Sequence, residues 1–384
     1  MFNDKISNYL IVGLILKIEI TSHIRSFMLY INLLIGRKMT MRKFFILLIS
    51  GILLITTGCS SNLKNKSQYP VSSTEFVLNT VSTVTIYSDN KENDPNEVIN
   101  DSFKLCRQYE NMLSRTIEGS EIDRINKSNG ETIEVSSEVS DLLNTSLKYS
   151  QLTNGNFDVT IEPVSSLWDF QSESAVPPDK ELIDKNINFV DYTQVDVNGN
   201  TVTLNNPNTA IDLGAIAKGY IADRMKEFLI EKGVTSAIIN LGGNILAIGE
   251  RDENKPFNIG IQSPTEEQNQ VIGSVEINNK SVVTSGVYER YFEYKGKRYH
   301  HILNPNTGYP VENELLSVTI ISDKSVDGDA LSTGCFVLGL EKGMELINSL
   351  ENVEAIFITK DNKLKVSDGI GKNVVFKELK NERI

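Results

Sequence analysis

The pattern of hydrophobic and polar positions divides the chain into a short N-terminal part and a long, regularly patterned body. An apolar run extends from Phe44 to Ile55, and a polar stretch without an apolar period follows it up to residue 73. From Thr74 onward, apolar residues recur with the spacings of helices and strands. We therefore expect one folded body over residues 74–384.

The body alternates between the two periods without a strict strand–helix–strand order. Helical spacing covers residues 96–113, 137–152, 214–232 (ending at Gly233) and 330–350 (broken near Gly339 to Gly343). Strand patterns cover residues 75–88, 236–249, 257–264, 273–286, 290–303, 316–322 and 353–368. Residues 195–206 predict a hairpin with Asn198-Gly199 as its turn. This order predicts an α+β fold, with mixed sheets and packed helices.

The net charge of the chain limits the classes of ligand that such a body would bind. The 384 residues carry a formal charge of −12, and residues 1–58 hold seven Lys and Arg against Asp4 and Glu19. Removing that +5 leaves −17 for the remainder. An acidic body is a poor nucleic-acid binder, because phosphate backbones need basic surface. It can still bind an anionic ligand when a divalent cation bridges the two.

The residues before Cys59 resemble a bacterial lipoprotein signal. A basic start at Arg42 and Lys43, the apolar run and three small residues lead into this cysteine, although Thr56 stands where such signals usually have Leu. The resemblance implies that residues 41–58 are a signal peptide and that Cys59 carries lipid. An uncleaved single-span anchor is the alternative, and both interpretations place the body outside the cytoplasm.

Two further segments complete the expected organisation. Residues 1–40 are interpreted as a non-structural extension upstream of a true start at Met39 or Met41, and residues 59–73 as a flexible tether. The two remaining cysteines, Cys106 and Cys335, have no spacing that indicates a disulfide framework or a zinc site. We expect them to be small apolar residues.

Three groups of polar residues are candidates for chemistry. His300 and His301 are adjacent on an expected strand, so at most one of them faces any one site. Asp329 and Thr333 lie four residues apart on one helix face and offer the hard oxygens that suit Mg²⁺. Each group also has a structural interpretation, namely a surface or core histidine, or an Asp329 that only caps its helix.

Asp212 and Lys218 form the third group, at a strand-to-helix junction with small residues that allow a ligand to approach the backbone closely. The structural alternative is a capped amphipathic helix with a solvent-exposed lysine. Neither of the common glycine-rich phosphate loops is present in the sequence.

Taken in order, several segments resemble the ApbE family of FAD:protein FMN transferases. They are LNTVSTVTIY (78–87), GNFDVTIEPVSSLWDF (155–170), DLGAIAKGY (212–220), NLGGN (240–244), TSGVYERYF (284–292), HHILNPNTGYP (300–310) and DALSTGCFVLG (329–339). The resemblance covers about residues 74–368 and implies a single catalytic body that is ApbE-like (T-fold-like).

The resemblance implies an enzyme that cleaves FAD and transfers FMN to a Thr or Ser hydroxyl of a partner protein, releasing AMP. It assigns Mg²⁺ to the Ala215 carbonyl, Asp329 and Thr333, and makes His301 and Asp329 the catalytic residues. It places FAD contacts at Asn79, Thr116, Asn156, Phe157, Asp158, Asp212, Lys218 and Ile302. The acceptors it implies are exported or membrane redox carriers.

This chain departs from the family pattern at two FAD contacts. Asn79-Thr80 stands where the family often has Met-Gly-Thr, and Thr116 stands near a position that is often aromatic. A Mg²⁺-dependent FAD pyrophosphatase would use the same residues with water as the nucleophile. A non-catalytic flavin-binding lipoprotein is the third alternative, and it has no need for Asp329, Thr333 and His301.

Overall fold

The structure, a computed structural model, describes residues 69–379 except residues 92, 173 and 265–269. The predicted extension, the signal peptide and Cys59 lie outside these residues, as does the tether up to residue 68. Strand β1 (Val71–Val77) begins three residues before the predicted start of the body. No helix within the described part is both long and apolar enough to cross a membrane.

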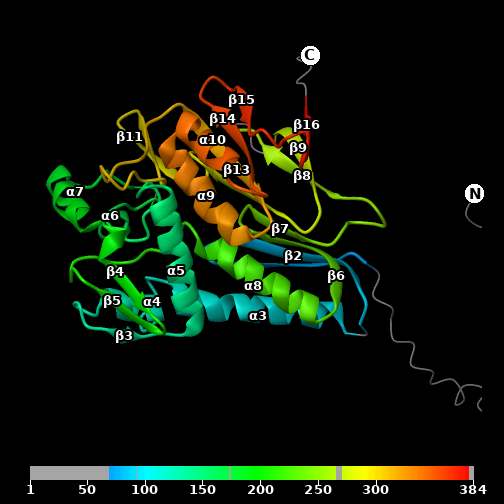
Figure 1. Ribbon diagram of the computed structural model, residues 1–384, viewed down its shortest axis with the longest axis horizontal. Helices are drawn as coiled ribbons and strands as arrows, with labels where there is room; N and C mark the ends of the chain where they lie inside the picture. The colour runs from blue at the N-terminus through cyan, green and yellow to red at the C-terminus, as the bar shows by residue number, and fades with distance from the viewer. Residues whose placement is uncertain (1–68, 92, 173, 265–269, 380–384) are drawn as a thin grey trace, which may run out of the picture. The chain divides into compact units, whose positions relative to one another are not determined.

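An antiparallel sheet of eight strands forms the centre of the body (Figure 1). Its order is β1, β2 (Thr80–Asp89), β6 (Val234–Leu241), β7 (Asn244–Ile248), β10 (Ser281–Gly286), β13 (Leu315–Ser322), β14 (Glu354–Thr359) and β15 (Leu364–Val366). The hairpins β1–β2, β6–β7 and β14–β15 join neighbours in sequence. The other neighbours are separated by long excursions of the chain.

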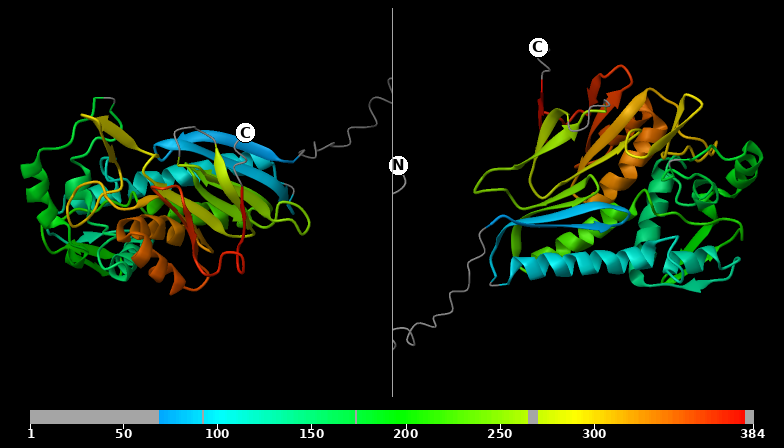
Figure 2. Two further views of the ribbon diagram at one scale, coloured as in Figure 1. Left: turned by 90° about the horizontal axis from the view of Figure 1, so that it is seen from above. Right: turned by 180° about the vertical axis from the view of Figure 1, so that it is seen from behind.

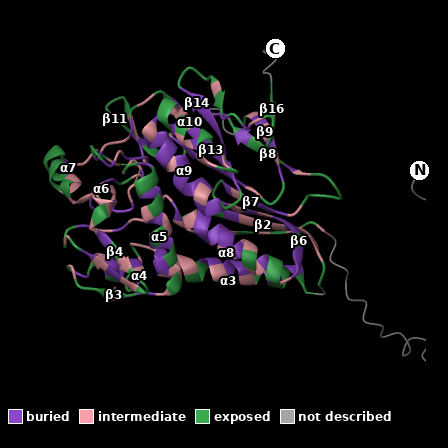
Figure 3. Cartoon of the chain, in the orientation of Figure 1, coloured by how far each residue is buried: buried purple, intermediate pink, exposed green. Residues whose placement is uncertain are grey.

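Four helices cover one face of this sheet, namely α3 (Pro95–Leu113), α8 (Ala217–Glu231), α9 (Ser325–Leu338) and α10 (Leu340–Asn348). Figures 1 and 2 show them gathered on one side of the strands, and Figure 3 shows that α9 consists mostly of buried residues. The opposite face packs against a three-stranded sheet of β8 (Phe257–Gln262), β9 (Val271–Ile277) and β16 (Val375–Glu378). Two hydrophobic layers therefore enclose the central strands.

Two excursions from the sheet form a lobe beside its helices. The first contains α4 (Glu121–Asn126), β3 (Ile133–Glu134), α5 (Ser137–Leu152), α6 (Glu162–Ser165), α7 (Lys180–Asn186), two short 3₁₀ helices (Ile187–Phe189 and Tyr192–Gln194), β4 (Val195–Asn198) and β5 (Thr201–Leu204). The second is the hairpin β11 (Tyr291–Tyr294) and β12 (Lys297–His300). An aromatic cluster around Trp168 and Phe292 joins the two excursions.

The α+β fold and most of the predicted elements are confirmed. The helix expected at 214–232 begins at Ala217 instead, because residues 214–216 form a turn. The 195–206 hairpin is present, but Asn198 pairs with Thr201, so its turn is Gly199-Asn200. Cys106 and Cys335 are both buried and free, as expected of small apolar residues.

Helix α8 crosses the start of α9 at close range. A Cβ atom at Gly219 would lie 2.3 Å from the carbonyl oxygen of Ser325. One turn further along α8, the Asp223 carboxylate accepts the N–H groups of Ser325 and Val326, each at 2.9 Å. Helix α8 therefore supplies the N-terminal cap of α9, and glycine is needed for the two backbones to meet.

We expect Gly219→Ala to lower the free energy of unfolding by about 1–3 kcal/mol, because the added methyl group overlaps the α9 backbone. In an uncrowded helix the same change raises the free energy of unfolding by about 1 kcal/mol. The sign of the measured change therefore shows whether the two helix backbones are in close contact. Urea denaturation of the full chain measures it. An unchanged or higher free energy of unfolding would contradict the close contact.

Candidate active site

One cavity of about 820 Å³ lies where the tips of the sheet hairpins, helices α8 and α9 and the lobe meet. Its wall contains every predicted site residue that the structure describes. These are Asn79, Thr116, Asn156, Phe157, Asp158, Asp212, Ala215, Lys218, His301, Ile302, Asp329 and Thr333. Folding thus brings together residues that are spread over more than 250 positions of the sequence.

Asp329 is a buried carboxylate in the second turn of α9, with 4% of its surface exposed. One of its oxygens accepts the N–H of Gly219 at 2.9 Å, and the other lies 3.5 Å from the Lys218 ammonium. The alternative that Asp329 only caps its helix is wrong, because α9 begins at Ser325 and Asp223 caps it. Thr333 follows one turn later, and its hydroxyl lies 3.2 Å from that of Ser285.

The turn before α8 places Ala215 in the same cavity wall. In a helix extended backwards, the Gly219 N–H would bond the Ala215 carbonyl, but it donates to Asp329 instead. Among the described residues, no group of three or more His, Cys, Asp or Glu side chains could hold a metal ion. The oxygens of Ala215, Asp329 and Thr333 are hard ligands, so the donor set fits Mg²⁺ rather than a softer metal.

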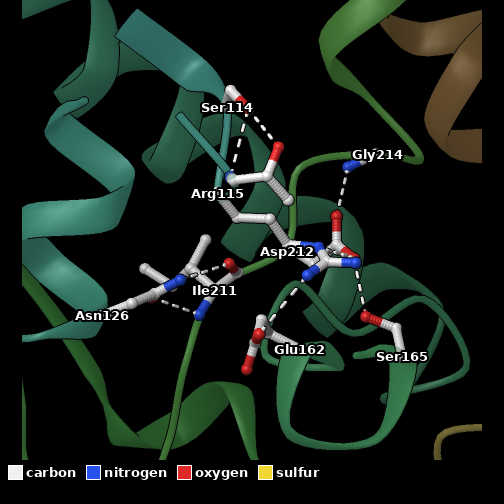
Figure 4. Close-up of polar contacts among 9 residues, drawn as sticks. Ser114, Arg115, Asn126, Glu162, Ser165, Ile211, Asp212 and Gly214 are labelled. Atoms are coloured by element: carbon white, nitrogen blue, oxygen red, sulfur yellow. Dashed lines mark hydrogen bonds and ion pairs between the residues drawn. The ribbon is translucent and has the colours of Figure 1, made fainter. Parts of the chain in front are cut away.

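Asp212 lies at the centre of a polar network that sequence reasoning did not predict (Figure 4). One carboxylate oxygen accepts the Gly214 N–H at 2.8 Å. The other accepts Arg115 Nε at 3.0 Å and the Ser165 hydroxyl at 2.7 Å. Arg115 also approaches Glu162 at 3.5 Å, and its guanidinium opposes the rise that burial causes in the pKa of Glu162. The network ties the end of α3 and the lobe to the start of α8.

The 156–158 segment lines the cavity, and two of its polar side chains also bond to neighbouring segments. Asn156 Nδ2 donates to the Thr153 carbonyl at 2.9 Å. Asp158 accepts the N–H and hydroxyl of Thr160 at 2.8 and 2.6 Å. Burial raises the pKa of Asp158, and these bonds oppose that shift. The side chains therefore fix the position of this segment.

The two adjacent histidines separate as the strand alternation predicts. His301 lines the cavity, whereas His300 is buried away from it and lies 3.0 Å from the Val311 carbonyl. His301 Nδ1 lies 3.2 Å from the Arg290 carbonyl. Burial, with the positive charge of Arg290, lowers the pKa of His301 to about 3. The ring is thus neutral at pH 7, and because a carbonyl only accepts, Nδ1 carries the proton and Nε2 is left as the acceptor.

Several cavity residues were not predicted individually, although quoted motifs contain some of them. Trp168 and Phe170, whose rings stack at 5.7 Å, belong to the 155–170 segment. Asn244 ends NLGGN, and its amide nitrogen is buried without a partner. Arg115 precedes the predicted Thr116, but its partner Asp212 lies 97 residues away. No local sequence pattern predicts such a pair.

Comparison with known families matches residues 78–357, more than half of the chain, to the ApbE family. The chain belongs to the ApbE family. Among the curated members, an FAD:protein FMN transferase of Klebsiella pneumoniae (strain 342) is 40% identical over 268 residues, covering 69% of this chain and 83% of the relative. One of Treponema pallidum (strain Nichols) is 33% identical over 312 residues, covering 77% and 86%.

Solved ApbE structures share the fold. The ApbE protein of Thermotoga maritima superposes with a TM-score of 0.72 at 29% identity, covering 78% of this chain and 97% of that one. The flavin transferase ApbE of Vibrio cholerae gives a TM-score of 0.71 at 26% identity, with the same coverage. The predicted ApbE-like body is therefore confirmed.

We expect Arg115→Met to lower the free energy of unfolding by roughly 1–3 kcal/mol, because it leaves the part-buried Asp212 and Glu162 carboxylates without their cation. Asp212→Asn in the same chain should recover part of this loss. Urea denaturation of the two single variants and the double variant gives the coupling energy. Strictly additive effects would mean that the ion pair contributes nothing.

Proposed function

We propose that this chain transfers FMN from FAD to a Thr or Ser hydroxyl of an acceptor protein and releases AMP. The curated relatives are FAD:protein FMN transferases. The observation that carries the proposal is the single cavity of about 820 Å³ that contains all twelve described candidate residues. Its volume lies within the usual range for ligand sites, about 300–1,000 Å³.

In this proposal, the chain's own residues hold and orient the donor. Lys218 offers an ammonium group to the pyrophosphate at the cavity wall. The 156–158 segment, Asn79, Thr116 and Ile302 provide contacts for the rest of FAD. The Arg115–Asp212 network holds the Asp212 carboxylate in one orientation, because three donors bind its two oxygens. Such positioning accounts for much of the catalysis of phosphoryl transfer.

Ala215, Asp329 and Thr333 would hold Mg²⁺, which supplies charge neutralisation for the pyrophosphate and for the departing AMP. The Lys218 ammonium lies 3.5 Å from the Asp329 carboxylate. We infer that this lysine balances the buried carboxylate until the substrate binds. The support for the metal is the hard-oxygen donor set.

His301 is proposed to accept the proton of the incoming hydroxyl. Its neutral ring, held through Nδ1 by the Arg290 carbonyl, presents Nε2 as an acceptor. The hydroxyl oxygen bonds to the FMN phosphorus, the bond from that phosphorus to AMP breaks, and AMP leaves with the bonding electrons. Proton transfer of this kind contributes a factor of about 10² to 10⁴.

The test is a transfer assay with the purified full chain, FAD, Mg²⁺ and an acceptor protein. We expect Asp329→Ala to lose metal-dependent transfer, because a hard-oxygen ligand is removed. We expect His301→Ala to bind FAD but to transfer FMN about 10² to 10⁴ times more slowly. Covalent flavin on the acceptor, detected by mass spectrometry, measures transfer, and quenching of flavin fluorescence measures binding.

Two neighbours serve as matched controls. Asp327 lies on the same helix but bonds the Tyr149 hydroxyl at 2.6 Å, and His300 faces away from the cavity. Asp327→Ala and His300→Ala should therefore retain transfer. Near-wild-type transfer by Asp329→Ala at low Mg²⁺ would refute the metal assignment. Free FMN in solution without flavin on the acceptor would identify a pyrophosphatase instead.

We also propose that the body is attached to the outer side of the cell membrane through lipid on Cys59. The support is the signal-like sequence of residues 41–58 and the small residues before the cysteine. We expect Cys59→Ser to abolish incorporation of labelled palmitate, whereas Cys106→Ser keeps it. Unchanged labelling and membrane attachment of the Cys59→Ser chain would favour another mode of anchoring.

A further inference from the structure

The tip of the β1–β2 hairpin carries an exposed apolar pair. Phe76 is 70% exposed and Val81 is 63% exposed, the two highest values among the large hydrophobic side chains that the structure describes. The two residues lie directly opposite each other in the hairpin. Within the paired part of the hairpin, the other side chains of this face are Ser and Thr, which bond across the strands as Ser72–Thr85 and Thr74–Thr83. An apolar pair at the end of a polar face has the character of a contact site.

Strand β1 is also an unprotected edge. It is the first strand of the central sheet, and no described strand pairs with its outer side. Val77 and Thr80 flank a two-residue turn, so the alternate residues Ser72, Thr74 and Phe76 direct their backbone N–H and C=O groups outward. The strand sequence VSSTEFV contains no Lys, no Pro and no bulge, the usual devices that block pairing with another chain.

This edge ends at the rim of the cavity. Leu78 and Asn79 form the turn, both with a left-handed φ of 55°, and both line the cavity. The Leu78 N–H donates to Glu110 at 2.9 Å, which fixes the tip to helix α3. Figure 2 (right) shows the blue hairpin pointing toward the green lobe. A chain that paired with β1 and continued past Val77 would therefore reach the cavity.

We propose that the acceptor protein docks here, with an extended segment paired to the outer edge of β1 and an apolar side chain covering Phe76 and Val81. The inference rests on the proposed function, because transfer to a protein requires a polypeptide segment to bring its hydroxyl to the cavity. The backbone edge gives affinity for any extended segment, and the apolar pair adds a position-specific contact. The acceptor's hydroxyl-bearing residue then lies beyond the end of β1, at the rim of the site.

The test uses the purified full chain, FAD and membranes from cells that lack its gene. The acceptor is the protein band that becomes covalently fluorescent with the wild-type chain. We expect Phe76→Ser to raise about tenfold the amount of membrane needed for half-maximal rate, because one aromatic side chain is no longer covered. The rate at saturating membrane and the affinity for FAD should not change.

The backbone edge is tested separately with a pair of variants at one position. Thr74→Pro removes an outward N–H while leaving the hydrogen bonds to β2 intact. We expect it to raise the amount of membrane needed for half-maximal rate at least as much as Phe76→Ser does. Thr74→Ala keeps the N–H and should behave as wild type. Val375→Ser, which removes a 48% exposed valine on the separate β16 strand, should also have no effect.

The outcomes distinguish this docking surface from the function it rests on. Wild-type kinetics for both Phe76→Ser and Thr74→Pro would overturn the docking surface while leaving the transfer reaction standing. No fluorescent band with the wild-type chain would refute the transfer reaction, and the docking surface with it. A change in the sedimentation of Phe76→Ser without a change in flavinylation would make the edge an interface between copies of this chain.

Discussion

The close contact between helices α8 and α9 is the constraint on which the site depends. Because Gly219 has no side chain, the start of α9 approaches α8 closely enough for the Gly219 N–H to bond the Asp329 carboxylate at 2.9 Å. In a longer helix the Gly219 N–H would donate to the Ala215 carbonyl, but here it donates to Asp329. This one backbone hydrogen bond thus positions the Asp329 carboxylate and leaves the Ala215 carbonyl without its helical hydrogen bond. Asp223 secures the arrangement by capping α9 from the neighbouring helix.

The rest of the cavity is built from excursions that leave an antiparallel sheet and return to it. The central strands provide a rigid base, since both of their faces are covered by hydrophobic layers. The two excursions that form the lobe close over one end of this base, and the aromatic cluster at Trp168 joins them. Cavity residues therefore come from hairpin tips and connecting turns as well as from helices α8 and α9 and strand β10. The exposed β1 edge lies at the rim of the same cavity, which places the proposed docking surface for the acceptor beside the site.

The sequence predicted the features that local periodicity encodes. The helices 96–113 and 137–152 have long apolar periods, and both are present within one residue of the predicted bounds. Helix α6 has only four residues, too few to show a period, and it was not predicted. The hairpin turn lies at Gly199-Asn200, one residue later than predicted, and it places Gly199, with a φ of 55°, at the first central position, which favours glycine. Five of the twelve described candidate residues were also named from local chemistry, namely Asp212, Lys218, His301, Asp329 and Thr333. The other seven came only through the family resemblance. Arg115 was missed, because its role depends on an aspartate that only folding brings near.

Diffraction from crystals of the full chain soaked with FAD and Mn²⁺ tests the account most directly, because Mn²⁺ takes the same hard-oxygen ligands as Mg²⁺ and scatters anomalously. The account predicts an anomalous peak at bonding distance, about 2.0–2.3 Å, from oxygens of Ala215, Asp329 and Thr333. It also predicts that Asp329→Ala crystals lack this peak while still containing FAD. A peak elsewhere in the cavity, or one that persists without the Asp329 carboxylate, would contradict the site that the contact between α8 and α9 creates.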